Sequence, residues 1–144
     1  MNRAALAETL DRVAAALASA HDDWWVIGST AVALHGAITD VSDIDILVSQ
    51  RDGVTLMAGW HGGVTIGAAS ERFRSTPYGR LAGAPLPIEV MGDLEVSVAG
   101  GWQRVVPATR IAIRGIFVPA RADLVDILYL FDRPKDRRRA ALLI

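Results

Sequence analysis

The chain has 144 residues, a net charge of −1 and no cysteine, and 51 % of its residues are hydrophobic. This length and composition predict one globular domain, residues 1–144, with a sizeable core. The small net charge excludes attraction of the whole protein to nucleic acid or anionic lipid, the lack of cysteine excludes disulfides and thiolate metal sites, and the single lysine, Lys135, excludes a Walker-type phosphate loop.

Apolar residues recur at helical or strand spacing through the first 60 residues. Leucines and a valine form one stripe of a helix at residues 3–19, for which Asn2 is a candidate N-cap. Gly36 is placed to end the second helix. The expected elements in chain order are a helix, a buried strand, a helix, a central strand and a short helix, at residues 3–19, 24–27, 30–35, 43–49 and 52–60.

The second half of the chain has strand-like patterns followed by two helices. Extended segments are expected at residues 64–68, 72–75, 87–91, 104–106 and 111–118, with Gly115 at a turn or bulge. A helix is expected at 122–131, and Pro134 begins a last helix that runs to Ile144. These elements predict the α/β (α+β) class, with a mixed central sheet flanked by an N-terminal helix and by closing helices within 120–144.

Two aspartates interrupt the apolar strand at residues 43–49. In an extended strand, Asp43 and Asp45 project from one face, while Ile44 and Ile46 point into the core. Two carboxylates about 5 Å apart repel by roughly 3 kcal/mol at an effective dielectric constant near 20. A neutralising cation is therefore expected, and Mg²⁺ is favoured because it takes oxygen ligands and shares them with substrate phosphates.

A glycine and a serine between a strand and a helix suit phosphate binding. Gly28 lets the backbone approach a ligand closely, and Ser29 adds a hydroxyl donor. Glu89, in the strand at 87–91, is the natural third carboxylate, because an acid among strand hydrophobes is costly to bury without a partner. Three carboxylates around one or two Mg²⁺ ions suit nucleotidyl transfer.

The run Ile27-Gly28-Ser29, followed by Asp43-Ile44-Asp45-Ile46, resembles the signature of the nucleotidyltransferase superfamily. This superfamily includes aminoglycoside and lincosamide transferases, polymerase-β-like enzymes and small bacterial toxin–antitoxin proteins. The specific motif lies within residues 24–49, and looser similarity extends to Arg139. The resemblance implies the nucleotidyltransferase fold.

The resemblance also implies residue roles and an activity. Gly28 and Ser29 would contact the nucleotide phosphates, Asp43 and Asp45 would bind Mg²⁺, and Glu89 would be the third catalytic acid. The implied reaction transfers a nucleoside monophosphate from an NTP, with ATP expected, to a hydroxyl acceptor and releases pyrophosphate. The helix at 122–131 lacks the lysine that small relatives often carry there.

Several charged residues have two interpretations. Glu89 either binds the metal or pairs with Arg72 or Arg74 across a sheet. Arg72, Arg74 and Arg80 either clamp phosphate or the acceptor, or form a solvated face. The basic segment 133–139 is either a solvated helix or a surface that contacts nucleic acid.

Three functional hypotheses remain open at this point. The favoured one is the metal-dependent enzyme, acting in the cytoplasm without a membrane-spanning segment or a signal peptide. The second is a non-catalytic module of the same fold that acts with a partner protein, as in toxin–antitoxin pairs, or as a homo-oligomer. The third is a nucleic-acid-binding protein that uses the basic segment.

Overall fold

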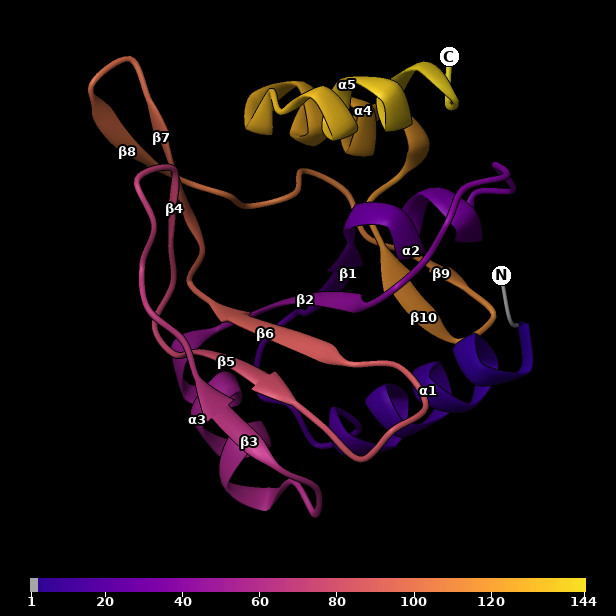
Figure 1. Ribbon diagram of the computed structural model, residues 1–144, viewed down its shortest axis with the longest axis vertical. Coiled ribbons are helices and arrows are strands. Elements are labelled where there is room, and N and C mark those ends of the chain that lie inside the picture. The colour runs from indigo at the N-terminus through magenta and orange to yellow at the C-terminus, as the bar shows by residue number, and fades with distance from the viewer. Residues whose placement is uncertain (1–2) are drawn as a thin grey trace.

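The computed structural model describes residues 3–144 and confirms the predicted α/β class with a mixed central sheet (Figure 1). The N-cap predicted at Asn2 lies outside the described residues. The helices are α1 Arg3–Ala16, α2 Gly28–Leu34, α3 Gln50–Gly59, α4 Arg121–Phe131 and α5 Pro134–Ala141. Within residues 3–144, each helix is too short or too polar to cross a membrane.

The central sheet has the strand order β1-β2-β6-β5-β3. These strands are β1 Trp25–Ile27, β2 Ile44–Val48, β6 Ile88–Gly92, β5 Tyr78–Leu81 and β3 Val64–Ile66. The pair β2 and β6 is parallel, whereas the other neighbouring pairs are antiparallel. The parallel pair lies in the middle of the sheet, and other elements pack against both of its faces.

Two smaller sheets extend the fold. One contains β4 Phe73–Arg74, β7 Glu95–Val98 and β8 Gly101–Arg104, in the order β4-β7-β8. The other is the hairpin of β9 Ile111–Ile113 and β10 Ile116–Val118. Gly115, with φ +79°, lies in the hairpin turn, which confirms the turn predicted there.

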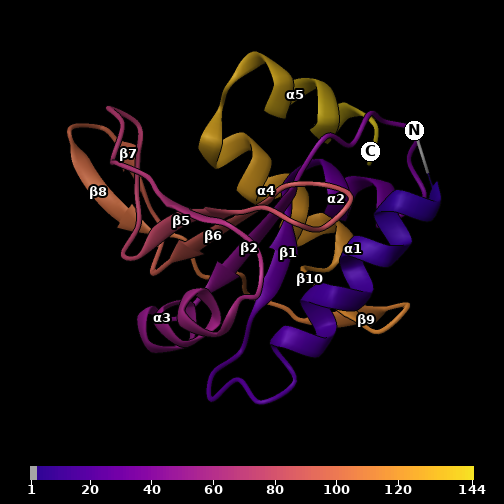
Figure 2. The same cartoon turned by 60° about the horizontal axis from the view of Figure 1, so that its bottom comes forward.

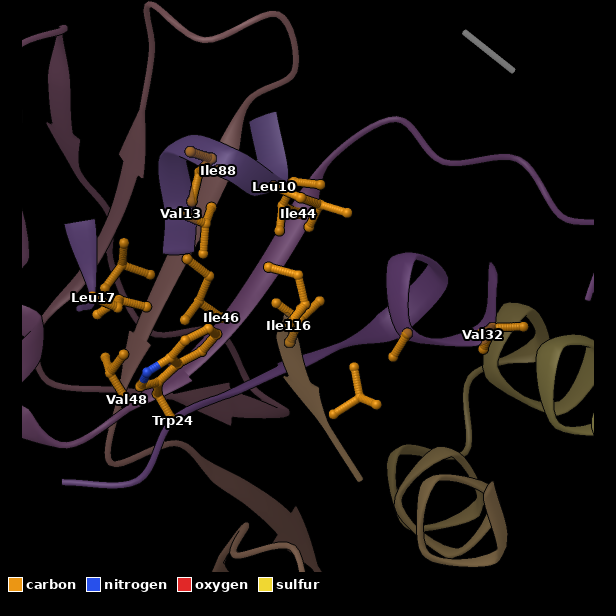
Figure 3. Close-up of a cluster of buried hydrophobic side chains, with 14 of the residues drawn as sticks. Leu10, Val13, Leu17, Trp24, Val32, Ile44, Ile46, Val48, Ile88 and Ile116 are labelled. Carbon is orange, nitrogen blue, oxygen red and sulfur yellow. The ribbon is translucent and has the colours of Figure 1, made fainter. Parts of the chain in front are cut away.

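The two faces of the central sheet bury different sets of apolar side chains. On one face, side chains of the central strands pack against α1 and β10; this cluster includes Leu10, Val13, Ile44, Ile46 and Ile116 (Figure 3). The other face carries a smaller cluster, in which strand residues meet α4 and β7. Helix α1 thus lies on one side of the sheet, and α4 and α5 lie toward the other (Figure 2).

Several predicted boundaries differ from the structure. The helices predicted at 3–19 and 134–144 end earlier, at Ala16 and Ala141, and α2 begins two residues before the predicted start. The strand predicted at 104–106 is wrong, because β8 ends at Arg104. The sequence pattern does not indicate β5 or β7. Glycine weakens the strand pattern of β5, and pairing with β6 compensates for it.

Candidate functional site

The three predicted acids form one cluster, which we call the acid cluster: Asp43, Asp45 and Glu89. Asp43 directly precedes β2, Asp45 lies within it, and Glu89 lies in β6 at the register position opposite Asp45. One carboxylate oxygen from each residue lies within 4.8 Å of the others. The flanking Ile44 and Ile46 are fully buried on the opposite face, which confirms the predicted alternation.

Asp45 is held in an unfavourable environment. Part of the residue reaches solvent, but its Oδ1 atom is buried and has no hydrogen-bond partner within residues 3–144. Burial raises the pKa of the Asp45 carboxyl well above its ordinary value, and the charges of Asp43 and Glu89 raise it further. An unpaired buried carboxylate destabilises the fold, so a proton or a positively charged ligand at this atom would relieve the cost.

The turn between β1 and α2 packs directly against Asp45. Ile27 lies opposite Asp45 in the antiparallel β1–β2 pair, and Gly28 follows with φ +68°. A Cβ atom on Gly28 would lie 2.5 Å from Asp45 Oδ2, so only glycine leaves the carboxylate its position. The predicted turn beside the aspartates is therefore present. Ser29 is buried there, with 3 % of its surface exposed.

A hydrogen bond ties this turn to the start of β2. Thr30 Oγ1 donates to the backbone oxygen of Asp43 at 3.0 Å, and Thr30 itself is fully buried. The glycine turn and the first aspartate are thus held in fixed relation, although thirteen residues separate them in sequence.

The acid cluster fits a hard divalent cation. Its donors are carboxylate oxygens, which Mg²⁺ prefers, and they converge within 4.8 Å of one another. The orphaned Asp45 Oδ1 supplies a ligand atom that makes no hydrogen bond to any group of residues 3–144. The residues present therefore suit Mg²⁺ in both chemistry and arrangement.

Of the three arginines considered from the sequence as phosphate or acceptor contacts, Arg80 contacts the acid cluster. Arg80, in β5, lies opposite Glu89 in register, and its Nη2 is 3.1 Å from Glu89 Oε1 and 3.7 Å from Asp43 Oδ2. Its side chain is 54 % exposed, and it does not reach the buried oxygen of Asp45. Arg80 thus neutralises part of the cluster from the solvent side.

The pairing of Glu89 with Arg72 or Arg74, considered from the sequence, is wrong. Arg74 pairs with Glu95 at 2.8 Å, and its guanidinium lies over the Trp102 ring at 4.3 Å. Arg72 donates a hydrogen bond to the backbone oxygen of Phe131. The cross-strand partner of Glu89 is instead Arg80, because the β5–β6 register places those two side by side.

A pocket of about 190 Å³ opens beside the acid cluster. Gly28, Asp45 and Glu89 form one part of its wall, and Arg74 lines it as well. The rest of the wall is largely apolar or aromatic: Ile27, Ala68, Ala69, Phe73, Tyr78, Met91, Leu94 and Phe131. The pocket combines anionic, aromatic and glycine-turn surfaces, which is a suitable setting for a nucleotide.

Tyr78 and Arg133 are among the pocket residues that the sequence analysis does not assign to the site. Tyr78 lies in β5, a strand that the pattern does not indicate. Arg133 was grouped with the basic segment 133–139, although it precedes a proline and lies three residues before Asp136. That spacing is the signal of a helix start, and Arg133 is the N-cap of α5.

The basic segment is partly paired within itself. Arg133 binds Asp136, and Arg137 Nη1 lies 2.8 Å from Asp132 Oδ1. Two of the cations in the segment therefore form ion pairs where α4 ends and α5 begins. They weaken the hypothesis that the whole segment is a nucleic-acid surface.

The acid cluster lies across the parallel pair of β2 and β6, beside the Gly28 turn, and the chain that carries it has the fold of solved nucleotidyltransferase structures. The chain resembles TM1012 of Thermotoga maritima, for which a nucleotidyltransferase function is proposed. The TM-score is 0.72 and the identity 23 %, over 90 % of this chain and 87 % of that one.

The fold is also similar to ANT(2'')-Ia in two structures. The complex with adenylyl-2''-tobramycin has a TM-score of 0.59 and 12 % identity, over 94 % of this chain and 84 % of that one. The solution structure of this antibiotic-resistance factor has a TM-score of 0.62 and 14 % identity, over 99 % of this chain and 84 % of that one. No protein-family model and no curated protein matches the chain.

Proposed function

We propose that this protein is a Mg²⁺-dependent nucleotidyltransferase that transfers a nucleoside monophosphate from an NTP to a hydroxyl acceptor and releases pyrophosphate. The observation that carries the proposal is the acid cluster, with its unpartnered Asp45 Oδ1, packed against the Gly28 turn. The solved complex of ANT(2'')-Ia with adenylyl-2''-tobramycin supports ATP as the nucleotide.

Each residue of the site has a role in this reaction. Asp43, Asp45 and Glu89 would hold one or two Mg²⁺ ions, which when bound neutralise phosphate charge and lower the pKa of the attacking hydroxyl. Gly28, which has no side chain, lets the triphosphate approach the turn, and Ser29 adds a hydroxyl donor. The acceptor oxygen would bond to the α-phosphorus while the bond from that phosphorus to the oxygen bridging it to the β-phosphate breaks, and Glu89 would take the hydroxyl proton.

Of Arg72 and Arg74, Arg74 suits the proposal better as a contact for phosphate or the acceptor. It lines the pocket, whereas Arg72 is bound to the backbone oxygen of Phe131. We assign Arg74 to the acceptor side, because it lines the pocket from β4, which belongs to a different sheet from β2 and β6.

The test is transfer of label from α-³²P-NTPs to components of a cell lysate, with Mg²⁺ present. We expect the wild-type protein to label one class of acceptor with ATP and Asp43→Asn or Asp45→Asn to label nothing. Asp126→Asn is the matched control, because Asp126 is an exposed carboxylate on α4, outside the acid cluster. Equal labelling by wild type and Asp45→Asn would contradict the proposal.

A second candidate is a non-catalytic module of the same fold that acts with a partner protein, as in toxin–antitoxin pairs, or as a homo-oligomer. The contacts of Arg80 with Asp43 and Glu89 favour it, as does the absence of lysine from α4. Co-purification of a partner together with no turnover of any NTP would select this candidate. Recovery of active protein from the cytoplasmic fraction would support the enzyme and its proposed location.

A further inference from the structure

Arg133 is fixed by a carboxylate that has no exposed surface. Its Nε lies 2.6 Å from Asp136 Oδ2 and its Nη2 lies 3.0 Å from Asp136 Oδ1, which makes the ion pair bidentate. The backbone N–H of Arg133 also donates to Asp136 Oδ2 at 3.2 Å. Asp136 is fully buried, and burying a charge so completely is costly unless the charge is paired and hydrogen-bonded, as it is here.

Aromatic rings hold the same guanidinium from other sides. Its central carbon lies 4.9 Å from the centroid of Phe73 and 5.9 Å from that of Phe131. The two rings pack edge to face at 5.1 Å. Phe73 comes from β4 and Phe131 from α4, so two separate elements fix the side chain. The arginine is therefore preorganised before any ligand arrives.

The fixed guanidinium lines the pocket that also contains Gly28 and Asp45. Asp136 engages Nε and Nη2, and Nη1 of Arg133 makes no hydrogen bond within residues 3–144. The other arginine of the pocket wall, Arg74, is already paired with Glu95 and stacked on Trp102. Arg133 thus brings a guanidinium of fixed position, with its Nη1 unengaged, to the pocket wall.

A triphosphate in this pocket has more negative charge than the metal ions at the acid cluster can neutralise. In the proposed reaction the α-phosphorus would lie at the acid cluster, so the β- and γ-phosphates would need a contact elsewhere on the pocket wall. Helix α4 has no lysine to meet them. The guanidinium of Arg133 is planar and suits phosphate oxygens.

We infer that Arg133 binds the terminal phosphates of the nucleotide and that Asp136 is the positioning residue that orients it. This inference rests on the proposed function and extends it, because it places the cation for the leaving pyrophosphate at the N-terminus of α5. The chain supplies this charge from the loop between its last two helices.

The test compares the affinity of Arg133→Gln and wild type for αβ-methylene-ATP and for AMP, with Mg²⁺, by isothermal titration calorimetry. We expect the triphosphate analogue to bind roughly ten- to a hundredfold more weakly to the variant, the range of a lost charge-assisted hydrogen bond. AMP lacks the terminal phosphates, so its affinity should change by less than about threefold. Asp136→Asn should weaken triphosphate binding in the same direction but by less.

Arg137→Gln is the matched control, because Arg137 lies on the same helix and pairs with Asp132. It should bind both ligands as wild type does. Equal losses for the two ligands in Arg133→Gln would assign Arg133 a structural role only and overturn the inference. Wild-type protein that binds neither ligand would overturn the proposed function as well, which separates the two failures.

Removal of Arg133 leaves Asp136 buried without its partner, and Arg133→Gln can misfold for that reason. A second variant therefore keeps the test interpretable. Arg133→Lys keeps the charge but not the two-pronged contact with Asp136. We expect a smaller, triphosphate-selective loss with native circular dichroism. Unchanged triphosphate affinity in a folded Arg133→Lys and a folded Asp136→Asn would also overturn the inference.

Discussion

Replacing Asp45 with asparagine tests the electrostatic cost that the fold carries at its centre. The substitution keeps the shape of the side chain and removes one charge from the acid cluster. Asp45 Oδ1 is buried without a hydrogen-bond partner within residues 3–144, and the carboxylates of Asp43 and Glu89 lie beside it. In the absence of metal, the loss of this charge should therefore stabilise the folded state.

The size of the gain follows from the geometry. Carboxylate oxygens of the acid cluster lie within 4.8 Å of one another, and unit charges at such a separation repel by about 3 kcal/mol at an effective dielectric constant near 20. Arg80 offsets part of this repulsion. The asparagine amide also has to be desolvated, so we expect a net gain on the order of 1–2 kcal/mol in the free energy of unfolding.

The assay is thermal unfolding at pH 7 in EDTA. The gain corresponds to a rise in Tm of roughly 3–6 °C for a domain of this size. Because the folded state raises the pKa of Asp45 above its unfolded value, the destabilisation is present above the folded pKa. It disappears as the pH falls below the unfolded pKa, so the advantage of Asp45→Asn should vanish in acid.

Addition of Mg²⁺ should reverse the order of the two proteins. Binding to the folded state raises the Tm of wild type with metal concentration, whereas Asp45→Asn should gain little. Asp126→Asn again serves as the control and should follow wild type. A lower Tm for Asp45→Asn in EDTA, or an equal response of both proteins to Mg²⁺, would refute the reasoning.

Three further predictions concern single contacts. Arg80→Met removes the cation that contacts Asp43 and Glu89, so Mn²⁺ should bind more tightly by calorimetry; an unchanged affinity would contradict the idea that Arg80 competes with a metal for these carboxylates. Gly28→Ala forces a Cβ against Asp45 at φ +68°, and denaturant unfolding should show a loss on the order of 1–3 kcal/mol. The hydrogen bond from Arg51 lowers the pKa of Asp22, so its stabilisation is present above the unfolded pKa and is lost as the pH falls. Urea titrations below pH 5 should therefore show a steeper loss for wild type than for Asp22→Asn.

The central motif was predictable because its signals are local. The alternation of Asp43, Ile44 and Asp45 fixes which side chains share a face of β2, whatever the strand pairs with. Gly28 marked the turn because few other residues adopt its backbone conformation. The fold class followed from the same short-range patterns in chain order.

The boundaries and the smaller strands were less predictable. Tyr78–Leu81 contains a glycine and an exposed arginine, so nothing in its pattern marks it as a central strand. It becomes one because β6 pairs along its whole length. Strand formation here depends on the partner more than on the propensity of the segment.

The composition of the site beyond its motif was decided by tertiary structure. Parallel pairing of β2 with β6 aligned Asp45 with Glu89, and the β5–β6 register brought Arg80 rather than Arg72 or Arg74 to that glutamate. The start of α5 carried Arg133 into the same pocket. Side-chain alternation is set within one strand and can be read from the sequence. Strand register and helix docking depend on contacts between segments far apart in the chain, and only the folded structure determines them.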